Sequence, residues 1–376
     1  MKPENRRIFY IVALITIVVL AIVLGLVFGL KSSGNEEKPE IPVPQPDPEP
    51  KEEEIDVLNL YNNTAELIKK FPVINNTTVI AGTIEEKIQN RLLTGFENWN
   101  RGFKTWKAWG NILYTNDSIY NVHGARLSLA HYQAAMDVSL QRQTILMGDF
   151  HNMLISDNFT AIHYDFITVT NGVKKVGKVM EFVRFMDYGE ELGTRVVEGW
   201  GSTKDTSYNG LINFQVEEKT EQEKQDDYNL KYQIPEGDNL TEKYVIKYPT
   251  KYVDQNANDI LQIVLKGFDS WNKGIDYYVK WVEEVFDENA TSSSLDERNR
   301  TMEEYKKEMK ELFGNYTITK LYFDNVLIRD NWAAMHYRYR REDKTKNINA
   351  YVGDRMEFYK FEEKDKKLKI VGSWIQ

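Results

Sequence analysis

Two halves of this chain repeat the same short sequences in the same order, and this internal repeat limits the possible folds more than any other feature. Four matches follow one another at offsets that drift only from 172 to 176 residues: 93–106 with 265–278, 151–165 with 324–338, 180–185 with 356–361, and Trp200 with Trp374. Matches in order with a slowly drifting offset indicate one unit copied twice. Each copy is therefore expected to bury its own core. We call the predicted domains copy 1 (83–202) and copy 2 (258–376), joined by a linker over 203–257.

Each copy begins with a helical pattern. Apolar residues spaced by three and four form one helix face, which recurs in the second copy: Ile84, Ile88, Leu92, Phe96, Trp99, Phe103 and Trp106, then Ile260, Val264, Phe268, Trp271, Ile275 and Tyr278. Thr83 and Glu86 form a capping-box pattern at the first start. Gly102 and Gly274 are expected to break or bend the helix.

A second helix and a series of strands follow. The helix is expected over 127–140 and 298–312, with Gly314 as the later C-cap. The period then changes to two, which predicts strands at 152–156, 160–168, 178–187 and 194–200, and at 317–329, 332–340, 350–361 and 367–375. Helices followed by an antiparallel sheet give the α+β fold class. The linker is acidic and polar, with a candidate hairpin from 211–216 and 244–248.

The N-terminal segment predicts a membrane anchor. Residues 8–30 are 23 residues without a charge, long enough to cross a hydrocarbon core. Arg6 and Arg7 precede them, so residues 1–7 are expected in the cytoplasm and the domains outside it, at the cell surface or in a lumen. A cleaved signal peptide is the alternative.

Residues 31–56 are rich in proline and acids, which predicts an extended stalk. Nine N-x-S/T sequons follow the anchor; they are chance occurrences or mark a glycoprotein.

Composition excludes several classes of function. The net charge of −9 argues against nucleic-acid binding. The absence of cysteine excludes disulfides, thiolate metal sites and a cysteine nucleophile. No metal-binding motif, glycine-rich phosphate loop or nucleophile elbow is present, so neither a metal nor a cofactor is expected.

The motif W-N-x-G in the first helix carries a family resemblance. Residues 99–102 and 271–274 read WNRG and WNKG, residues 113–117 read LYTND, residues 124–126 read GAR, and Gly199-Trp200 lies near the last strand. In this pattern the chain resembles the SnoaL-like branch of the nuclear-transport-factor-2-like superfamily, in two tandem copies. Phe103 stands where the family usually has Asp, and copy 2 lacks the Gly-x-x helix start. The resemblance implies two cone-shaped domains, each with an apolar pocket between helix and sheet. It also implies sheet-to-sheet pairing, here as an intramolecular pseudo-dimer.

Polyketide cyclases and ketosteroid isomerases, which this family includes, use pocket Asp and His as acid and base. His163 and Asp165 share one face of a predicted strand and are the candidate catalytic pair. The copy 2 counterparts are His336 and Arg338, so the pair is not a feature of the repeat. The simpler interpretation is a structural histidine within the sheet.

The remaining candidates are ligand contacts: Trp99, Phe103, Trp106, His131, Arg184, Glu198, Trp271 and His336. The aromatic residues also fit a core, and Arg184 with Glu198 also fits a cross-strand ion pair on a solvated face. Two functions remain open. The preferred one is a non-catalytic protein that binds a small apolar or aromatic ligand, or a partner, at a membrane. The alternative is an enzyme of cyclase or isomerase type acting in copy 1.

Overall fold

The computed structural model describes residues 64–76, 79–122, 125–189, 193–203, 220–232, 235–249, 254–294, 298–345 and 351–376. The predicted tail, anchor and stalk, and the candidate strand 211–216, lie outside these residues. Within them, every helix is too short or too polar to be a candidate membrane span.

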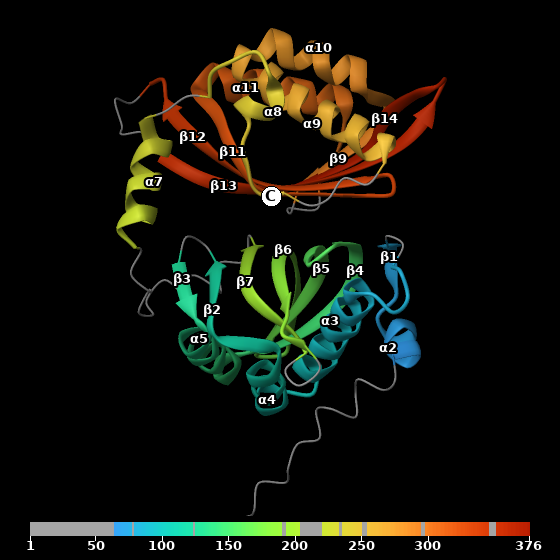
Figure 1. Cartoon of the computed structure of the whole chain (residues 1–376), viewed down its shortest axis with the longest axis vertical. Coiled ribbons are helices and arrows are strands. Elements are labelled where there is room, and N and C mark those ends of the chain that lie inside the picture. The colour runs from blue at the N-terminus through green and yellow to red at the C-terminus, as the bar shows by residue number, and fades with distance from the viewer. Residues whose placement is uncertain are drawn as a thin grey trace, which may run out of the picture. The chain divides into compact units, whose positions relative to one another are not determined.

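Copy 1 folds as helices on one face of a seven-stranded sheet (Figure 1). Its elements are α2 (Thr64–Lys70), β1 (Val73–Asn76), α3 (Ile84–Asn100), α4 (Phe103–Leu113), β2 (Tyr114–Val122), β3 (Ala125–Ser128), α5 (Leu129–Arg142), β4 (Thr144–Ser156), β5 (Phe159–Thr170), β6 (Val173–Asp187) and β7 (Thr194–Thr203). The sheet order is β1-β4-β5-β6-β7-β2-β3. This confirms the α+β prediction for the first half.

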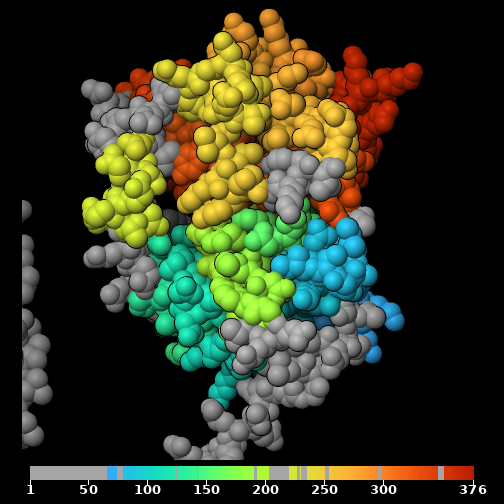
Figure 2. All heavy atoms as spheres, viewed as in Figure 1, coloured from blue at the N-terminus to red at the C-terminus, as the bar shows by residue number. Residues whose placement is uncertain are grey.

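Copy 2 repeats the plan after helix α7 (Glu221–Tyr232). Its elements are α8 (Leu240–Lys243), β8 (Ile246–Pro249), α9 (Gln255–Lys273), α10 (Ile275–Val285), β9 (Phe286–Ser294), β10 (Asn299–Thr301), α11 (Met302–Asn315), β11 (Tyr316–Arg329), β12 (Trp332–Asp343), β13 (Tyr351–Lys364) and β14 (Lys367–Ile375). In the space-filling view the atoms of α8, α9 and α10, yellow to orange, cover this half (Figure 2).

The two sheets have the same topology. Read from the opposite end, the second order is β8-β11-β12-β13-β14-β9-β10, which matches the first strand by strand. The same two pairs are parallel in each sheet: β1 with β4 and β2 with β7, then β8 with β11 and β9 with β14. The repeat in the sequence is therefore a repeat of the fold. Strands β1 and β8 precede residues 83 and 258, so each sheet begins earlier than the predicted domain starts.

The W-N-x-G motif joins the first helix to the sheet in both copies. Trp99 Nε1 donates to the carbonyl of Ile145 and Trp271 Nε1 donates to that of Ile318, each at 2.9 Å. The adjacent asparagine bonds both backbone groups of one strand residue, Met147 in copy 1 and Lys320 in copy 2. These bonds satisfy backbone groups beside a register shift in β4 and β11.

The glycine of this motif ends the helix as predicted. Gly102 and Gly274 have φ of 118° and 115°, a region that side-chain-bearing residues rarely adopt. Two other helix-end predictions are wrong. Glu86 accepts from the backbone of Gly82 rather than from Thr83. A capping box is present instead at Thr301 and Glu304, where the side chain can reach back to the N-cap backbone.

The predicted C-cap at Gly314 is also wrong, because α11 continues through Asn315 and its C-cap is Tyr316. Of the candidate hairpin from 211–216 and 244–248, the first segment lies outside the described residues, and the second overlaps β8, which pairs in parallel with β11. Strands β1, β2, β3, β9 and β10 were not predicted.

A glycine inside the first helix of each copy is required by close packing. A Cβ on Gly267 would lie 2.6 Å from Trp281 Cζ2, and one on Gly95 would lie 2.3 Å from Trp109 Cη2. Such overpacking costs about 1–3 kcal/mol.

We expect Gly267→Ala to lower the free energy of unfolding by about 1–3 kcal/mol in urea titrations. The matched control is Gly314→Ala in α11, where the added methyl meets open space. It should stabilise by up to about 1 kcal/mol. Equal effects from the two variants would contradict this packing.

Three apolar clusters form the interior. One lies between helices and sheet in copy 1, and one lies between helices and sheet in copy 2. The third cluster lies on the sheet faces that point away from the helices, which we call the outer faces. It contains residues from both sheets: Leu154, Phe159, Ala161, Met180, Phe182, Trp200, Leu327, Trp332, Ala334, Met356 and Phe358. Both faces of the central strands are therefore buried.

Candidate functional site

A cavity of about 80 Å³ lies in copy 1 between α3, α4 and the inner face of the sheet. Its lining is mainly aromatic and aliphatic, with one carboxyl group, Glu181, and one serine, Ser202. It includes Phe96, Trp99, Trp106, Tyr114, Tyr120, Tyr132, Met147, Tyr164, Val179 and Val183. An apolar cavity with a few polar groups is the usual form of a small-molecule site. We therefore take it as the candidate functional site.

Glu181 projects into the cavity because of the alternation along β6. Val179 and Val183, two residues away on the same strand face, belong to the copy 1 core. The adjacent residues Met180 and Phe182 point the other way and belong to the outer-face cluster. Tyr120 Oη donates to Glu181 Oε1 at 2.6 Å, and Tyr164 Oη donates to the same oxygen at 3.0 Å. Among the described residues, none donates to Oε2 of Glu181.

Burial raises the pKa of Glu181, and the two tyrosine hydrogen bonds oppose this rise only in part. Removal from water disfavours the charged carboxylate, and among the described residues no cation contributes to lowering its pKa. The facing phenols remain neutral, since burial also raises the pKa of Tyr114 and that of Tyr120. The cavity thus holds a carboxyl group that keeps its proton to a higher pH than a solvent-exposed glutamate does.

The equivalent carboxyl in copy 2, Glu357, is surrounded differently. Tyr337 Oη donates to Oε1 at 2.5 Å and Tyr359 Oη to Oε2 at 2.7 Å. Lys320 and Arg355 both act on it electrostatically. Burial raises the pKa of Glu357, but these cations and hydrogen bonds outweigh burial and leave it lowered. Burial lowers the pKa of Lys320 to about 8, against the opposing effect of Glu357.

Strand pairing identifies the substitutions that separate the copies. Lys320 is the counterpart of Met147, because their strand partners, Tyr339 and Phe166, are equivalent. Arg355 is the counterpart of Val179, because their strand partners, Tyr337 and Tyr164, are equivalent. Tyr359 likewise takes the place of Val183. In copy 2, three long polar side chains thus stand where copy 1 has Met147, Val179 and Val183, all of which line its cavity.

The predicted catalytic pair lies on the other side of the sheet. His163 is on the outer face, with Nδ1 3.1 Å from Asn152 Nδ2 and its ring 6.2 Å from that of Phe358. Burial lowers the pKa of His163 to about 3, with His151 adding to the effect. Asp165 instead contacts His151 Nε2 at 2.7 Å and Lys178 Nζ at 2.9 Å. The structure therefore does not bring His163 and Asp165 together at the cavity.

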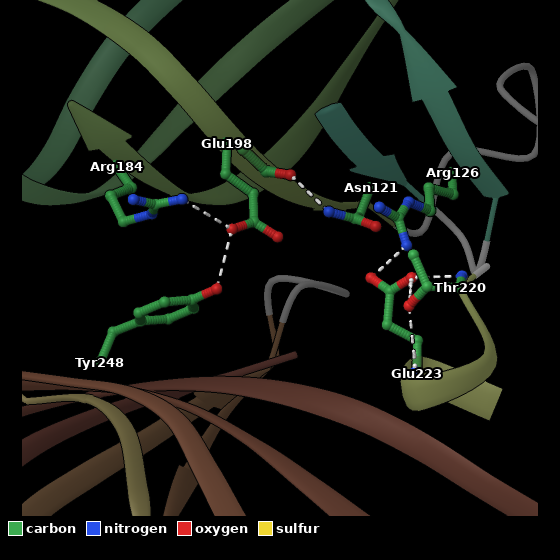
Figure 3. A network of polar contacts seen from close by, with 8 residues as sticks. Asn121, Arg126, Arg184, Glu198, Thr220, Glu223 and Tyr248 are labelled. Carbon is green, nitrogen blue, oxygen red and sulfur yellow. Dashed lines mark hydrogen bonds and ion pairs between the residues drawn. The ribbon is translucent and has the colours of Figure 1, made fainter. Parts of the chain in front are cut away.

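Other predicted contacts also lie away from the cavity. Arg184 and Glu198 are cross-strand partners in register, and their side chains form an ion pair at 3.3 Å. Tyr248 Oη donates to Glu198 at 3.1 Å (Figure 3). His336 Nε2 lies 3.0 Å from Asp354. Arg184 and Glu198 thus form the cross-strand ion pair, but on the partly buried outer face and not on a solvated one.

Of the predicted aromatic ligand contacts, some line the cavity and others do not. Trp99 and Trp106 line the cavity, with ring centroids 4.9 Å apart. Phe103 packs half-buried against the copy 1 core, and Trp271 is buried in the copy 2 core. His131 lies at the start of α5, where its Nδ1 is 3.1 Å from Ser128 Oγ.

Sequence reasoning missed Glu181, although a signal was present. On β6, Val179, Glu181 and Val183 alternate with Met180 and Phe182, so both faces of this segment are apolar apart from the glutamate. A charge at a position that alternation assigns to the interior marks a buried ionisable group. Within the described ranges, no group of three or more His, Asp or Glu side chains is arranged to hold a metal ion.

Glu181→Gln should change the pH dependence of stability. The folded-state pKa of Glu181 is raised, so between the unfolded pKa of about 4.3 and the folded pKa the folded protein binds the extra proton. The stability from this group is complete below the unfolded pKa and is lost as pH rises through the folded pKa. The variant lacks this titration. Its free energy of unfolding relative to wild type should therefore rise with pH across that window in urea titrations, and a constant difference would contradict the assignment.

Comparisons with known proteins give structural matches only. No family model matches the chain, and no curated protein matches it. A ketosteroid isomerase-like protein from Erwinia carotovora atroseptica has 8% identity and a TM-score of 0.27, covering 33% of this chain and 96% of its own. An NTF2-like protein of unknown function from Pseudomonas putida has 9% identity and a TM-score of 0.25, covering 32% and 84%.

A protein described as a SnoaL-like polyketide cyclase, from Jannaschia sp. CCS1, has 13% identity and a TM-score of 0.28, covering 34% of this chain and 90% of its own. Each match spans about a third of the chain. The matched structures include proteins described as SnoaL-like and NTF2-like.

Proposed function

We propose that this chain is a membrane-anchored, extracytoplasmic protein with two cone-shaped SnoaL-like domains, of which copy 1 binds a small ligand and copy 2 is a structural partner. The uncharged segment 8–30 and the arginines before it support the anchor and its orientation. One observation carries the ligand-binding role. Glu181 lies in a cavity without a compensating cation, whereas the equivalent Glu357 is balanced by Lys320 and Arg355.

The size of the cavity restricts the ligand. Pockets for drug-sized molecules have volumes of about 300–1,000 Å³, and the copy 1 cavity has about 80 Å³. A ligand of a few non-hydrogen atoms fits this space, with an apolar body against Trp99 and Trp106 and a polar end at Glu181. Molecules of polyketide or steroid size need more room than these side chains leave.

The outer-face cluster supports a structural role for copy 2. Its apolar side chains come from both sheets, including Phe182 and Trp200 from copy 1 and Trp332 and Phe358 from copy 2. Burying apolar surface between the sheets stabilises both domains. We therefore propose that the copies act as an intramolecular pseudo-dimer.

A catalytic role is the second candidate, and Glu181 is the observation that favours it. A carboxyl in a cavity, with a pKa raised by removal from water, can serve as a proton donor or acceptor in catalysis. In this form of the alternative, Glu181 takes the place of the predicted pair His163 and Asp165. Binding remains the preferred role, since it requires only the cavity and its lining.

A fragment screen by thermal shift on the full-length protein tests the proposal. Small fragments that bind the cavity should raise the melting temperature of the wild type by mass action. They should fail to do so in Val179→Phe, which fills the cavity from β6. The matched control is Val173→Phe on the same strand, because Val173 is 59% exposed and lies outside the cavity lining.

The same fragments should shift the indole NMR signals of Trp99 and Trp106, which reports binding without any variant. The proposal fails if no fragment stabilises the wild type. It also fails if Val179→Phe folds and is stabilised as strongly as Val173→Phe.

A further inference from the structure

We infer that the cavity of copy 1 binds a small organic cation, an amine in its ammonium form, at the position that Lys320 Nζ occupies in copy 2. The inference rests on the proposed function and specifies its ligand class. In copy 2 the chain supplies its own ammonium group to a set of aromatic rings and a carboxylate. In copy 1 the corresponding rings and carboxyl are retained, and Met147 stands in place of the lysine.

The aromatic part of the site is defined by Lys320. Its Nζ lies 4.2 Å from the ring centroid of Phe268, 4.7 Å from that of Trp271 and 4.7 Å from that of Tyr337. Ring faces at such distances attract a cation through their quadrupoles. The side chain of Lys320 is only 4% exposed. Copy 2 therefore holds a buried ammonium group in an aromatic cage.

Copy 1 retains this cage. Phe96, Trp99 and Tyr164 occupy the equivalent positions, and all three line the cavity. The rings of Phe96 and Tyr164 lie 5.0 Å apart at 76°. Their counterparts in copy 2 lie 4.6 Å apart at the same angle. The ring geometry that holds the lysine is thus already formed beside an empty volume.

The carboxyl supplies the complementary charge. Glu181 lies in the cavity lining with these rings, and its Oε2 accepts no hydrogen bond from the described residues. An ammonium group placed there would offset the burial of the ionised carboxylate, as Lys320 does for Glu357. A neutral ligand would supply no such charge. The combination of three rings and an unbalanced carboxyl therefore favours a cation.

Calorimetric titration of the full-length protein in detergent micelles tests the inference. The probes are n-butylammonium, which reproduces the side chain of lysine, and n-butanol, a neutral molecule of nearly the same size. We expect n-butylammonium to bind at least about tenfold more tightly than n-butanol. Glu181→Gln should remove that preference. The control Glu198→Gln, which alters a carboxyl on the outer face, should keep it.

The outcomes separate the two proposals. If n-butanol binds as tightly as n-butylammonium, or if Glu181→Gln keeps the preference, the cation inference is wrong while small-ligand binding stands. If neither probe nor any small fragment binds the wild type, both proposals fail.

Discussion

Glu357→Gln should lower the free energy of unfolding by about 3–5 kcal/mol at neutral pH, because it leaves buried positive charge without its partner. Glu357 is 3% exposed and Lys320 is 4% exposed. Two tyrosines donate to the carboxylate, and Arg355 acts on it as well. The attraction of both cations is lost when the charge is removed. Urea unfolding followed by circular dichroism measures the change.

The repeat provides the matched control for this variant. Glu181→Gln makes the same substitution at the equivalent position of copy 1, where no cation balances the carboxyl, and it should cost no stability at neutral pH. Adding Lys320→Met to Glu357→Gln should recover part of the loss, with a coupling energy within about 0.5–3 kcal/mol. Equal losses at Glu181 and Glu357, or no coupling to Lys320, would contradict the charge arrangement described for copy 2.

Met147→Lys should close the copy 1 site, with the affinity for n-butylammonium reduced at least about a hundredfold, or about 2.7 kcal/mol. The new side chain starts from the position equivalent to Lys320 and faces the same ring set. Its ammonium group would occupy the cage and balance Glu181. Calorimetric titration of the variant measures the affinity.

Met147→Leu is the control for this substitution, since it keeps an apolar side chain of similar volume and should bind n-butylammonium within a few-fold of wild type. The lysine variant should also lower the pKa of Glu181, which shows that the new charge has reached the cavity. Wild-type affinity in a folded Met147→Lys protein would refute the equivalence of the two sites.

The repeat made the architecture predictable, but not every strand. Matching segments predicted eight strands, and these correspond to β4–β7 and β11–β14. Strands β2 and β9 were missed because their sequences, YTNDSIYNV and FDENATSSS, contain runs of polar residues that break the apolar alternation. They form by parallel pairing with β7 and β14, a tertiary interaction that periodicity along one segment does not report.

The choice of strand face could not be made from the sequence. Alternation on β5 correctly separates His163 from Ile162 and Tyr164. Both faces of this strand are buried, however, because the outer face joins the third apolar cluster. Without a polar face, the pattern does not indicate which side lines the cavity. The predicted acid and base lie on the face opposite the cavity.

A comparison of charges between the copies would have indicated the candidate site. Copy 2 places Lys320, Arg355 and Glu357 in apolar strands, whereas copy 1 keeps only the glutamate, Glu181. Buried charges are costly unless they are paired, so an unpaired member of a repeated set is a candidate for function.

The most direct test of the charge difference between the copies is pH titration by NMR of the side-chain carboxyl carbons of Glu181 and Glu357, with and without n-butylammonium. We expect a pKa of Glu181 above its ordinary value and a pKa of Glu357 below it. We also expect n-butylammonium to lower the pKa of Glu181 and to leave that of Glu357 unchanged. A Glu181 that titrates below its ordinary value in the free protein, or that does not respond to the amine, would contradict the proposed cation site.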